Sequence, residues 1–457
     1  MEEFDVVILG AGPAGYVAGL RSAQRGFKTA VIEKAYLGGV CLNQGCIPTK
    51  TLLESARQIN LIEKAEESGI GIGKLHIDLN KIWERKRKVV ENLRRGIEYL
   101  FKTRGVTLFR GKAELIDSNT IKIIDGAGRI KAKNIVIAVG SSPAELPDLK
   151  FDHKNILSSD DILEESPSFS SLLIVGGGVI GCELASLFSS LGVKVTIVEL
   201  LKNLLPQEDI EISQALEASF RKRGIVVITQ RRVTKLDIKE STVIATLSDG
   251  TTIEVDKILV SVGRSPNTGD LGLENSGINL QKGWIVVDEY LRTSVPHIFA
   301  IGDTIGRVFL AHVAMFQGER VVENIEGRNK KMSYEAIPNC IYTFPEIATI
   351  DMKEIEAKER GLNYGVGKFP FRALGKAHTT GEMEGFLKVI IDKREEIVLG
   401  AHAIGNNVID IIPELTLAIK NRIKIKDILE TIHAHPTFSE IIPEAIFSSL
   451  NFPMHLA

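Results

Sequence analysis

One arrangement of residues occurs twice in the chain and constrains the fold more than any other feature. An apolar run at residues 5–9 leads into a glycine turn, a helical pattern at 16–25, and a second apolar run at 28–33 that ends in an acid. The same order returns at residues 172–199, at a constant offset of 166 residues. The matching positions are Gly10, Gly12, Gly15, Gly26, Lys28 and Glu33 in the first copy, and Gly176, Gly178, Gly181, Gly192, Lys194 and Glu199 in the second. This duplication predicts two strand–helix–strand units of the same kind.

A second internal repeat extends these units. Residues 134–143 resemble residues 257–266 at an offset of 123, and each reads as a buried strand that runs into a glycine turn. After residue 334, apolar runs at 386–391 and 397–404 alternate with helical patterns at 409–420 and 425–431. We therefore predict an α/β fold with two Rossmann-like dinucleotide-binding domains and a C-terminal α+β domain. The expected boundaries are 1–147, 148–266, a segment at 267–335 that completes the first domain, and 336–457.

Composition narrows the class of protein. Lys and Arg (56) nearly balance Asp and Glu (58), for a net charge of −2, which argues against a nucleic-acid partner. No apolar run reaches the length of a membrane span, so none is expected. The first residues carry no basic segment followed by a long apolar one, so we expect a cytoplasmic protein. Four cysteines in 457 residues are too few for a disulfide scaffold.

Both glycine turns have the composition of a dinucleotide site. Glycine permits a tight turn and close approach to a pyrophosphate, and the following helix offers free N–H groups to the phosphates. Glu33 and Glu199 each lie 18 residues beyond the last glycine, within reach of ribose hydroxyls. The carboxylate of Glu199 would repel a 2′-phosphate, which favours NAD over NADP. The alternatives are glycine turns of a doubly wound fold without nucleotide, and a plain acid at a strand end.

Two cysteines stand five positions apart in the segment at residues 38–50. In a regular helix this spacing separates the Cα atoms of Cys41 and Cys46 by about 8.6 Å, which exceeds the usual disulfide range of about 4.4–6.8 Å. A bond would need an irregular turn, which Gly45 permits. A helix N-terminus and the nearby Lys50 would favour a thiolate, so we expect a catalytic pair. The alternative is two reduced cysteines buried in a glycine-rich loop, whereas Cys182 and Cys340 read as small core residues.

Two further motifs carry ionisable groups. An apolar run ends in Gly302-Asp303, which places a carboxylate at the end of a strand, where open α/β sheets bind ligands. Its alternative is a turn with an Asp cap. Near the C-terminus, Glu440 follows His435 by five residues and could orient its imidazole for acid–base work. A structural pair, or a metal site in which His433 and His435 share one face of a strand, remains an alternative reading.

Taken together, these motifs resemble the flavoprotein disulfide reductases, the class I pyridine nucleotide-disulfide oxidoreductases, over essentially the whole chain. Leu42-Asn43 and Ile47-Pro48-Thr49-Lys50 are more similar to the dihydrolipoamide dehydrogenase branch than to the glutathione branch. The resemblance implies an NAD-dependent oxidation of protein-bound dihydrolipoamide through a Cys41–Cys46 disulfide and FAD. The first domain would then bind FAD, the second NAD, and the C-terminal domain would form the interface of a homodimer.

The resemblance also implies roles for individual residues. Cys41 would form the mixed disulfide, Cys46 would face the flavin, and His435 would be the base that Glu440 orients. His433 would support this pair, and Lys50 and Glu183 would pair beside the flavin. The implied FAD contacts are Gly10, Gly12, Pro13, Ala14, Gly15, Glu33, Lys34, Gly39, Val40, Cys41, Lys50, Gly140, Gly302, Asp303, Ala311 and His312. The implied NAD contacts are Gly176, Gly178, Val179, Ile180, Gly181, Glu199 and Gly263, and no metal is implied.

In the family, the histidine motif reaches the disulfide from the other subunit, so the resemblance implies an obligatory homodimer. The implied partner is the lipoyl-bearing acyltransferase of a 2-oxo acid dehydrogenase complex, or the lipoyl carrier of glycine cleavage. Val139 replaces the usual Thr of a family turn, and Gln44 stands where the family is often apolar. Val179 stands where NADP-dependent relatives often carry Tyr, in agreement with Glu199. Two rivals remain, an NAD(P)H-dependent reductase of another small disulfide and a flavin-free structural or NAD-sensing protein.

Overall fold

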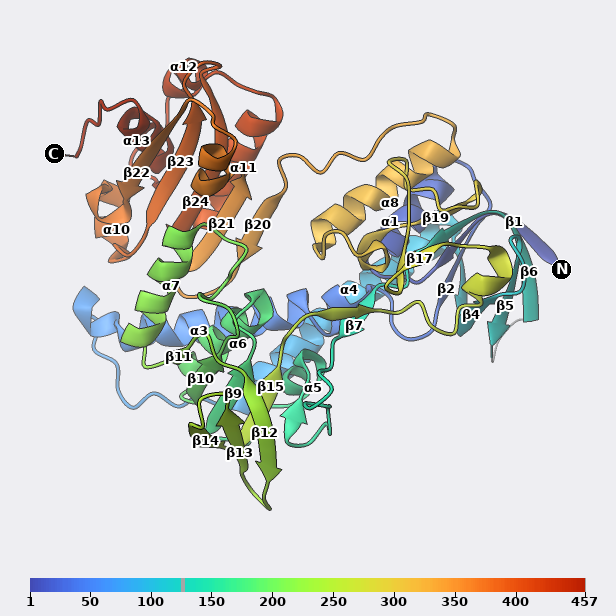
Figure 1. Cartoon of the computed structure of the whole chain (residues 1–457), viewed down its shortest axis with the longest axis horizontal. Coiled ribbons are helices and arrows are strands. Elements are labelled where there is room, and N and C mark those ends of the chain that lie inside the picture. The colour runs from blue at the N-terminus through green and yellow to red at the C-terminus, as the bar shows by residue number, and fades with distance from the viewer. Residues whose placement is uncertain (125–127, 457) are drawn as a thin grey trace. The chain divides into compact units, whose positions relative to one another are not determined.

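The computed structural model describes residues 1–124 and 128–456, and these residues form two compact units (Figure 1). Unit 1 comprises residues Met1–Leu146, Ser158–Pro167 and Val262–Ser333. Unit 2 comprises Pro147–Leu157, Ser168–Ser261 and the C-terminal part from Tyr334. The chain therefore passes from the first unit to the second three times and ends in the second. Among the described residues, no helix is both long and apolar enough to cross a membrane.

Unit 1 is built around a seven-stranded sheet. Five of its strands are parallel, in the order β3-β2-β1-β6-β19, and β5 and β4 extend it in antiparallel fashion beside β6. The strands are β1 (Glu2–Leu9), β2 (Thr29–Glu33), β3 (Thr107–Arg110), β4 (Lys112–Leu115), β5 (Thr120–Ile124), β6 (Gly128–Ile137) and β19 (Ile298–Ala300). Its central strands are buried on both sides, which explains their continuous apolar runs.

Helices and short strands complete unit 1. Helix α1 (Pro13–Gln24) packs along α8 (Ala311–Ile325), as Figure 1 shows. The remaining elements are α2 (Gly39–Asn43), α3 (Cys46–Glu63), η1 (Ala65–Ser68), α4 (Leu79–Arg104), β7 (Ser141–Pro143), α5 (Ser159–Glu164), β16 (Arg264–Pro266), η2 (Leu273–Ser276), β17 (Leu280–Gln281), β18 (Trp284–Ile285) and η3 (Gly302–Ile305).

Unit 2 repeats the parallel arrangement in its first part. Its five parallel strands have the order β11-β10-β9-β15-β8, which matches the order β3-β2-β1-β6-β19 of unit 1. A three-stranded antiparallel sheet, β12-β13-β14, projects beside it. The elements are β8 (Ile156–Leu157), β9 (Ser171–Val175), α6 (Val179–Ser190), β10 (Lys194–Val198), α7 (Ile210–Lys222), β11 (Val226–Ile228), β12 (Val233–Ile238), β13 (Val243–Leu247), β14 (Thr252–Val255) and β15 (Lys257–Val260).

The C-terminal part of unit 2 has an antiparallel sheet instead of a parallel one. It forms a five-stranded antiparallel sheet in the order β20-β21-β24-β23-β22, and helices α11 and α13 pack on it (Figure 1). The elements are β20 (Pro338–Ile341), β21 (Glu346–Asp351), α9 (Glu354–Glu359), β22 (Tyr364–Pro370), η4 (Phe371–Ala373), α10 (Gly375–Thr380), β23 (Phe386–Asp392), β24 (Ile397–Gly405), α11 (Val408–Lys420), α12 (Ile425–Leu429), η5 (Phe438–Glu440) and α13 (Ile441–Ser449).

The predicted fold class is confirmed, and the two helices that were predicted after the glycine turns differ from the prediction at their first residues. Helix α1 begins at Pro13 rather than at the expected residue 16, and α6 begins at Val179 rather than at 182. Proline fits the first helical position because the N–H that it lacks would have no partner inside the helix. Both helices therefore start inside the glycine turn, directly beside the second glycine of the motif.

Candidate functional site

The first glycine turn is packed too tightly for side chains at two of its positions. A Cβ on Gly15 would lie 1.9 Å from the carbonyl oxygen of Gly10, and a Cβ on Gly10 would lie 2.5 Å from that of Ala138. Gly12 differs, because the nearest atom to a Cβ there is 3.9 Å away. Gly12 is also the N-cap of α1, so no side chain of its own accepts the first N–H groups of the helix. This open space beside free N–H groups fits a pyrophosphate.

Glu33 closes the turn from the end of β2. Its Oε2 accepts a hydrogen bond from the N–H of Ala11 at 2.7 Å, and its Oε1 accepts one from the N–H of Ala35 at 2.8 Å. The side chain is buried with 8% of its surface exposed. A carboxylate oxygen can accept more than one hydrogen bond, so a fixed Glu33 retains capacity for ribose hydroxyls.

The second turn reproduces this geometry. A Cβ on Gly181 would lie 2.1 Å from the oxygen of Gly176, whereas one on Gly178 would meet nothing within 4 Å. Glu199 accepts from the N–H of Gly177 at 2.6 Å and from that of Leu201 at 2.8 Å. The two predicted sites thus share their packing, their open position and their fixed acid. Both fit the dinucleotides that the sequence implies.

The cysteine pair lies where two helices meet the first turn. Cys41 is in the short helix α2, and Cys46 is the first residue of α3 after the break at Gly45. The N–H of Gly38 donates to the carbonyl of Ala11 at 2.8 Å. A Cβ on Gly39 would lie 2.6 Å from the Cα of Gly12, so the start of α2 approaches the turn backbone to backbone. The irregular turn that a bond between Cys41 and Cys46 would need is therefore present.

Both cysteines are in the reduced form in this structure and only partly buried. The pKa of Cys41 is raised by its hydrogen bond to Cys46, by burial and by negative charge at Cys46, and the positive charge of Lys50 opposes the shift. Cys46 lies at the N-terminus of an 18-residue helix, whose dipole favours a thiolate. The arrangement therefore disfavours the thiolate form of Cys41 and places Cys46 where a helix N-terminus favours a thiolate.

Asp303 lies in η3, directly after β19, and contacts a short ribbon formed by β7 and β16. Its Oδ2 accepts a hydrogen bond from the hydroxyl of Ser141 at 2.5 Å and lies 3.6 Å from Nε of Arg264. The N–H of Gly302 donates to Oε1 of the buried Gln317 at 2.6 Å. Asp303 is thus held by side chains, and a simple turn cap does not describe it.

The two C-terminal histidines have different surroundings. Nδ1 of His435 lies 2.8 Å from Oε1 of Glu440, and its side chain is 74% exposed. Nε2 of His433 lies 2.8 Å from Oε1 of Glu414, and its side chain is only 8% exposed. The pKa of Glu440 lies below its usual value. Burial would raise this pKa, but the hydrogen bond from the N–H of Thr437 and the bond to His435 lower it. Glu440 can therefore orient His435 and leave Nε2 directed outward.

The alternative metal site assumed that His433 and His435 lie on one strand, and the structure differs from that assumption. Residues 431–437 form no strand, so the two rings do not share a strand face. In the described part of the chain, no group of three His, Cys, Asp or Glu side chains could hold a metal ion. The strand that this alternative assumed is therefore absent, and His433 contacts Glu414 instead.

The other predicted contacts follow from their positions in these elements. Pro13 and Ala14 open α1, Val40 lies in α2, Lys34 follows β2, and Ala311 and His312 open α8. Gly140 has a positive φ of 71° and joins β6 to β7. Ile180 lies in α6, and Gly263 has a φ of 134° after β15. Glu183 is buried in α6, and its Oε1 accepts the N–H of Tyr342 at 3.0 Å.

The sequence analysis missed several residues around the first turn. Ser141 and Arg264 contact Asp303, and Gln317 fixes Gly302. Burial raises the pKa of Tyr16, and negative charge at Cys41 would raise it further. Only Tyr16 had a signal in the sequence, because it directly follows Gly15. Cys182 is fully buried as expected, whereas Cys340 is only partly buried.

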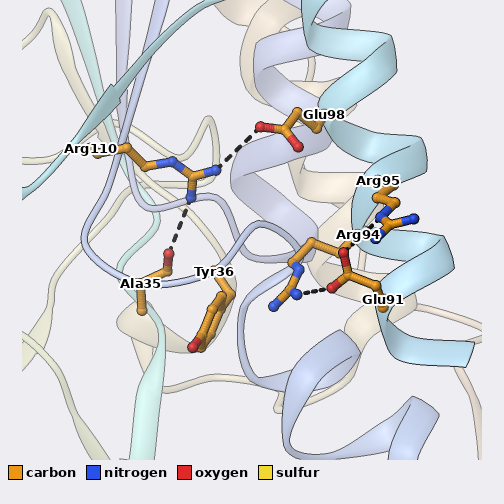
Figure 2. A pocket seen from close by; sticks show the side chains of 7 residues that line it. All are labelled: Ala35, Tyr36, Glu91, Arg94, Arg95, Glu98 and Arg110. Carbon is orange, nitrogen blue, oxygen red and sulfur yellow. Dashed lines mark hydrogen bonds and ion pairs between the residues drawn. The ribbon is translucent and has the colours of Figure 1, made fainter. Parts of the chain in front are cut away.

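A separate cleft of about 370 Å³ lies beside the end of β2. Figure 2 shows that Arg110 extends between the carbonyl of Ala35 and the carboxylate of Glu98, while Arg94 pairs with Glu91. Its lining residues are Ala35, Tyr36, Glu91, Arg94, Arg95, Glu98 and Arg110. Because its arginines are already paired within the cleft, we assign it no ligand.

Comparisons with known proteins agree with this geometry. Residues 4–318 match the family model of the pyridine nucleotide-disulphide oxidoreductases, and residues 337–446 match the dimerisation domain of the same family. The second match implies that the chain forms a homodimer.

Relatives extend the similarity over the full length. The chain is 41% identical to a dihydrolipoyl dehydrogenase of Chlamydia pneumoniae over 456 residues, covering 99% of this chain and 98% of that one. It is 40% identical to a dihydrolipoyl dehydrogenase of Bacillus subtilis (strain 168), covering 99% of each chain. The crystal structure of LpdA from Mycobacterium tuberculosis matches with a TM-score of 0.91 at 28% identity, covering 97% of this chain and 99% of that one.

A second solved structure is also similar. The HOCl-induced flavoprotein disulfide reductase RclA from Escherichia coli, in a Cu(II) complex, matches with a TM-score of 0.89 and 28% identity over 97% of this chain and 99% of that one. The repeated dinucleotide turns, the cysteine pair and the dimerisation domain all lie within the matched residues. The chain therefore belongs to the pyridine nucleotide-disulphide oxidoreductase family and, within it, to the dihydrolipoyl dehydrogenases.

Proposed function

We propose that the chain oxidises dihydrolipoamide to lipoamide and reduces NAD⁺ to NADH, with Cys41 and Cys46 as the redox pair. The observation that carries this proposal is the position of the pair, at the start of α3 and against the first dinucleotide turn. The full-length similarity to dihydrolipoyl dehydrogenases supports the choice of substrate. The lipoyl group arrives on a partner, either an acyltransferase of a 2-oxo acid dehydrogenase complex or a lipoyl carrier protein.

The two dinucleotide turns have separate roles in this proposal. The turn at Gly10–Gly15, with Glu33 and Asp303, holds FAD, and the turn at Gly176–Gly181, with Glu199, holds NAD⁺. FAD, when bound, accepts the electron pair of the dithiol and transfers it as hydride to NAD⁺. The open positions at Gly12 and Gly178 and the two fixed carboxylates support this assignment.

The protein's own groups carry out the exchange of sulfur bonds. His435 removes a proton from one thiol of dihydrolipoamide, and the resulting thiolate attacks the sulfur of Cys41 in the oxidised pair. The Cys41–Cys46 bond breaks, and Cys46 leaves as a thiolate at the N-terminus of α3. The second thiol of the substrate then gives up its proton, and its sulfur attacks the substrate sulfur of the mixed disulfide. The S–S bond of lipoamide forms, and Cys41 leaves as a thiolate that takes up the proton. The electron pair now resides on the cysteine pair.

The base belongs to a second copy of the chain in this proposal. His435 and Glu440 lie at the C-terminal end of the part that matches the dimerisation domain, and His435 is strongly exposed in one copy. A dimer would bring this pair to the cysteines of its partner. Glu440 fixes the ring through Nδ1, so that Nε2 is the atom that takes the substrate proton.

The assay of NADH formation from dihydrolipoamide and NAD⁺ tests this function. Cys46→Ser should lower kcat by about a thousandfold or more, because it removes the thiol that receives the electron pair. Cys340→Ser is the matched control and should retain the activity. A higher kcat/KM for NADH-dependent reduction of glutathione-type or mycothiol-type disulfides would contradict the substrate assignment.

The nucleotide preference rests on Glu199. Its two oxygens are fixed by backbone N–H groups, so it cannot swing away from a 2′-phosphate without losing both bonds. We expect kcat/KM for NAD⁺ to exceed that for NADP⁺ by at least about a hundredfold, because contact between two negative charges costs several kcal/mol. Comparable values for the two nucleotides would show the assignment to be wrong.

A further inference from the structure

The second internal repeat brings its own two copies into contact. Strands β7 and β16 pair antiparallel, with Ser142 opposite Ser265 at the centre of the ribbon. These serines are equivalent positions of the repeat, 123 residues apart. The neighbouring equivalent positions have diverged, to Ser141 in the first copy and Arg264 in the second. They lie diagonally across the ribbon, where side chains on one face can meet.

Ser141 and Arg264 form hydrogen bonds with each other, and both contact Asp303. Nε of Arg264 donates to Oγ of Ser141 at 2.6 Å, and a second guanidinium nitrogen donates to the Ser141 carbonyl at 2.7 Å. Arginine has only donors and a carboxylate only acceptors, so the Ser141 hydroxyl must donate its proton to Asp303. That bond is 2.5 Å long, and Ser141 is 1% exposed. The order of donors is therefore fixed from Arg264 through Ser141 to Asp303.

A second carboxylate lies near the same guanidinium. Burial raises the pKa of Asp160, at the start of α5, and the positive charge of Arg264 opposes that rise. The far end of α5 is also held, because the buried Lys86 and Trp83 of α4 donate to the carbonyl of Leu163 at 2.8 and 3.1 Å. Arg264 is itself largely buried, with 13% of its side chain exposed.

We propose that Arg264 is a positioning residue of the flavin site, which acts through Ser141 to hold the Asp303 carboxylate in the orientation that binds FAD. The contacts of Asp303 with Ser141 and Arg264 both use Oδ2, so Oδ1 serves the cofactor. Charge-assisted bonds of this kind are stronger than neutral ones. This inference rests on the proposed function, because it takes Asp303 to be an FAD ligand.

A double-mutant cycle on the full-length holoprotein tests the inference, with FAD release followed by the recovery of free-flavin fluorescence. Arg264→Gln should release FAD about 10- to 100-fold faster, the size expected for a lost hydrogen bond to a charged group. Asp303→Asn should also accelerate release. The double variant should release FAD within about twofold of Asp303→Asn alone, because Arg264 acts only through that carboxylate.

Two further variants separate positioning from general stability. Arg264→Lys keeps the charge but loses the two-pronged contact, so its release rate should lie between those of wild type and Arg264→Gln. Arg328→Gln removes another arginine of unit 1, which is exposed and pairs with Glu326 at 2.9 Å, and should leave release unchanged. The thermal midpoint of the apoprotein should be the same in Arg264→Gln and wild type, whereas the increase caused by FAD should be smaller in the variant.

Release from Arg264→Gln within twofold of wild type, or additive effects in the double variant, would overturn the inference while FAD binding itself stands. An equal fall in the thermal midpoint with and without FAD would also overturn it, since that result marks a purely structural role. A wild-type chain that binds no FAD would instead overturn the proposed function, and this inference with it.

Discussion

Single side chains influence the pKa of the cysteine pair. The hydrogen bond from Cys41 to Cys46, together with burial, raises the pKa of Cys41, while Lys50 acts in the opposite direction. Lys50 lies one helical turn after Cys46 in α3, on the same side of the helix. The electrostatics of the pair therefore depend on one lysine and one helix N-terminus.

Lys50→Gln tests this dependence. Removing the ammonium group removes the influence that lowers the pKa of Cys41, so ionisation of the reduced pair should move to higher pH. The pH profile for alkylation of the dithiol should shift upward, and alkylation at neutral pH should slow by about tenfold, the effect of one pKa unit. Lys64→Gln, at the C-cap of the same helix, is the control. An unshifted profile in Lys50→Gln would contradict the assignment.

At the scale of residues, the sequence predicts what lies within one segment. The glycines, the two acids and the cysteine pair are readable because their spacing is local, and His435 with Glu440 is separated by only five residues. The contact of Ser141 with Arg264 is not readable in this way, because it forms between segments 123 residues apart. The contact of His433 with Glu414 was not predicted either, because the two residues lie in different segments of the chain.

At the scale of elements, the internal repeat is the main organising fact. The strand orders β3-β2-β1-β6-β19 and β11-β10-β9-β15-β8 are the same, although only the central part of each was readable from glycines and apolar runs. Helix α4 was not predicted at all, although it has 26 residues. Its apolar residues recur at helical spacing, but only three of its residues are buried, and Leu93 and Leu100 of this helix are exposed.

Alanine at the third glycine of each dinucleotide turn should impair only the nucleotide site of that turn. An added Cβ would lie 1.9 Å from a carbonyl oxygen in Gly15→Ala and 2.1 Å in Gly181→Ala. Such overpacking costs about 1–3 kcal/mol, so each variant should lose about tenfold or more of its own nucleotide affinity. Gly15→Ala should purify with little FAD, whereas Gly181→Ala should keep FAD and show a raised KM for NAD⁺.

Gly71→Ala is the control for this pair, since a Cβ there would meet nothing within 4 Å. Flavin content per chain and the KM for NAD⁺ measure the two effects. Equal loss of FAD from Gly15→Ala and Gly181→Ala would show that the two copies do not have separate roles.

A buried lysine connects elements of unit 2. Lys388 of β23 is 1% exposed and lies within 3.2 Å of Asp209, 2.8 Å of Glu211 and 2.6 Å of Glu354. Burial alone would lower the pKa of Lys388, but its bonds to Glu211 and Glu354 outweigh burial and raise it. A raised pKa means that the ammonium form stabilises the fold throughout the neutral range, and that this contribution is lost only at strongly alkaline pH.

Lys388→Met should therefore lower the free energy of unfolding by about 3–5 kcal/mol, because it leaves the buried carboxylate of Asp209 without its cation. Lys368→Met removes a more exposed lysine that also pairs with Glu211, and should cost about 0–1 kcal/mol. Denaturant unfolding of the two holoproteins provides the measurement. Equal losses in the two variants would contradict a special role for the buried cation.

At the scale of the whole molecule, one chain supplies two different parts of the reaction. The cysteine pair belongs to unit 1, and His435 with Glu440 belongs to unit 2, in the part that matches a dimerisation domain. The division of the molecule into α/β units and an antiparallel C-terminal sheet could be predicted, because it follows from patterns of apolar residues. The assembly of a site from two chains rests on the family resemblance, since no local pattern encodes a contact between copies.

The most direct test of this account is the activity of a mixed dimer in which one chain carries Cys46→Ser and the other carries His435→Ala. A dimer that shares its sites keeps one intact site, formed by the cysteines of the second chain and the base of the first. We predict about half of the wild-type rate of NADH formation from dihydrolipoamide, against near-zero rates for both parent dimers. A mixed dimer no more active than either parent would contradict the account.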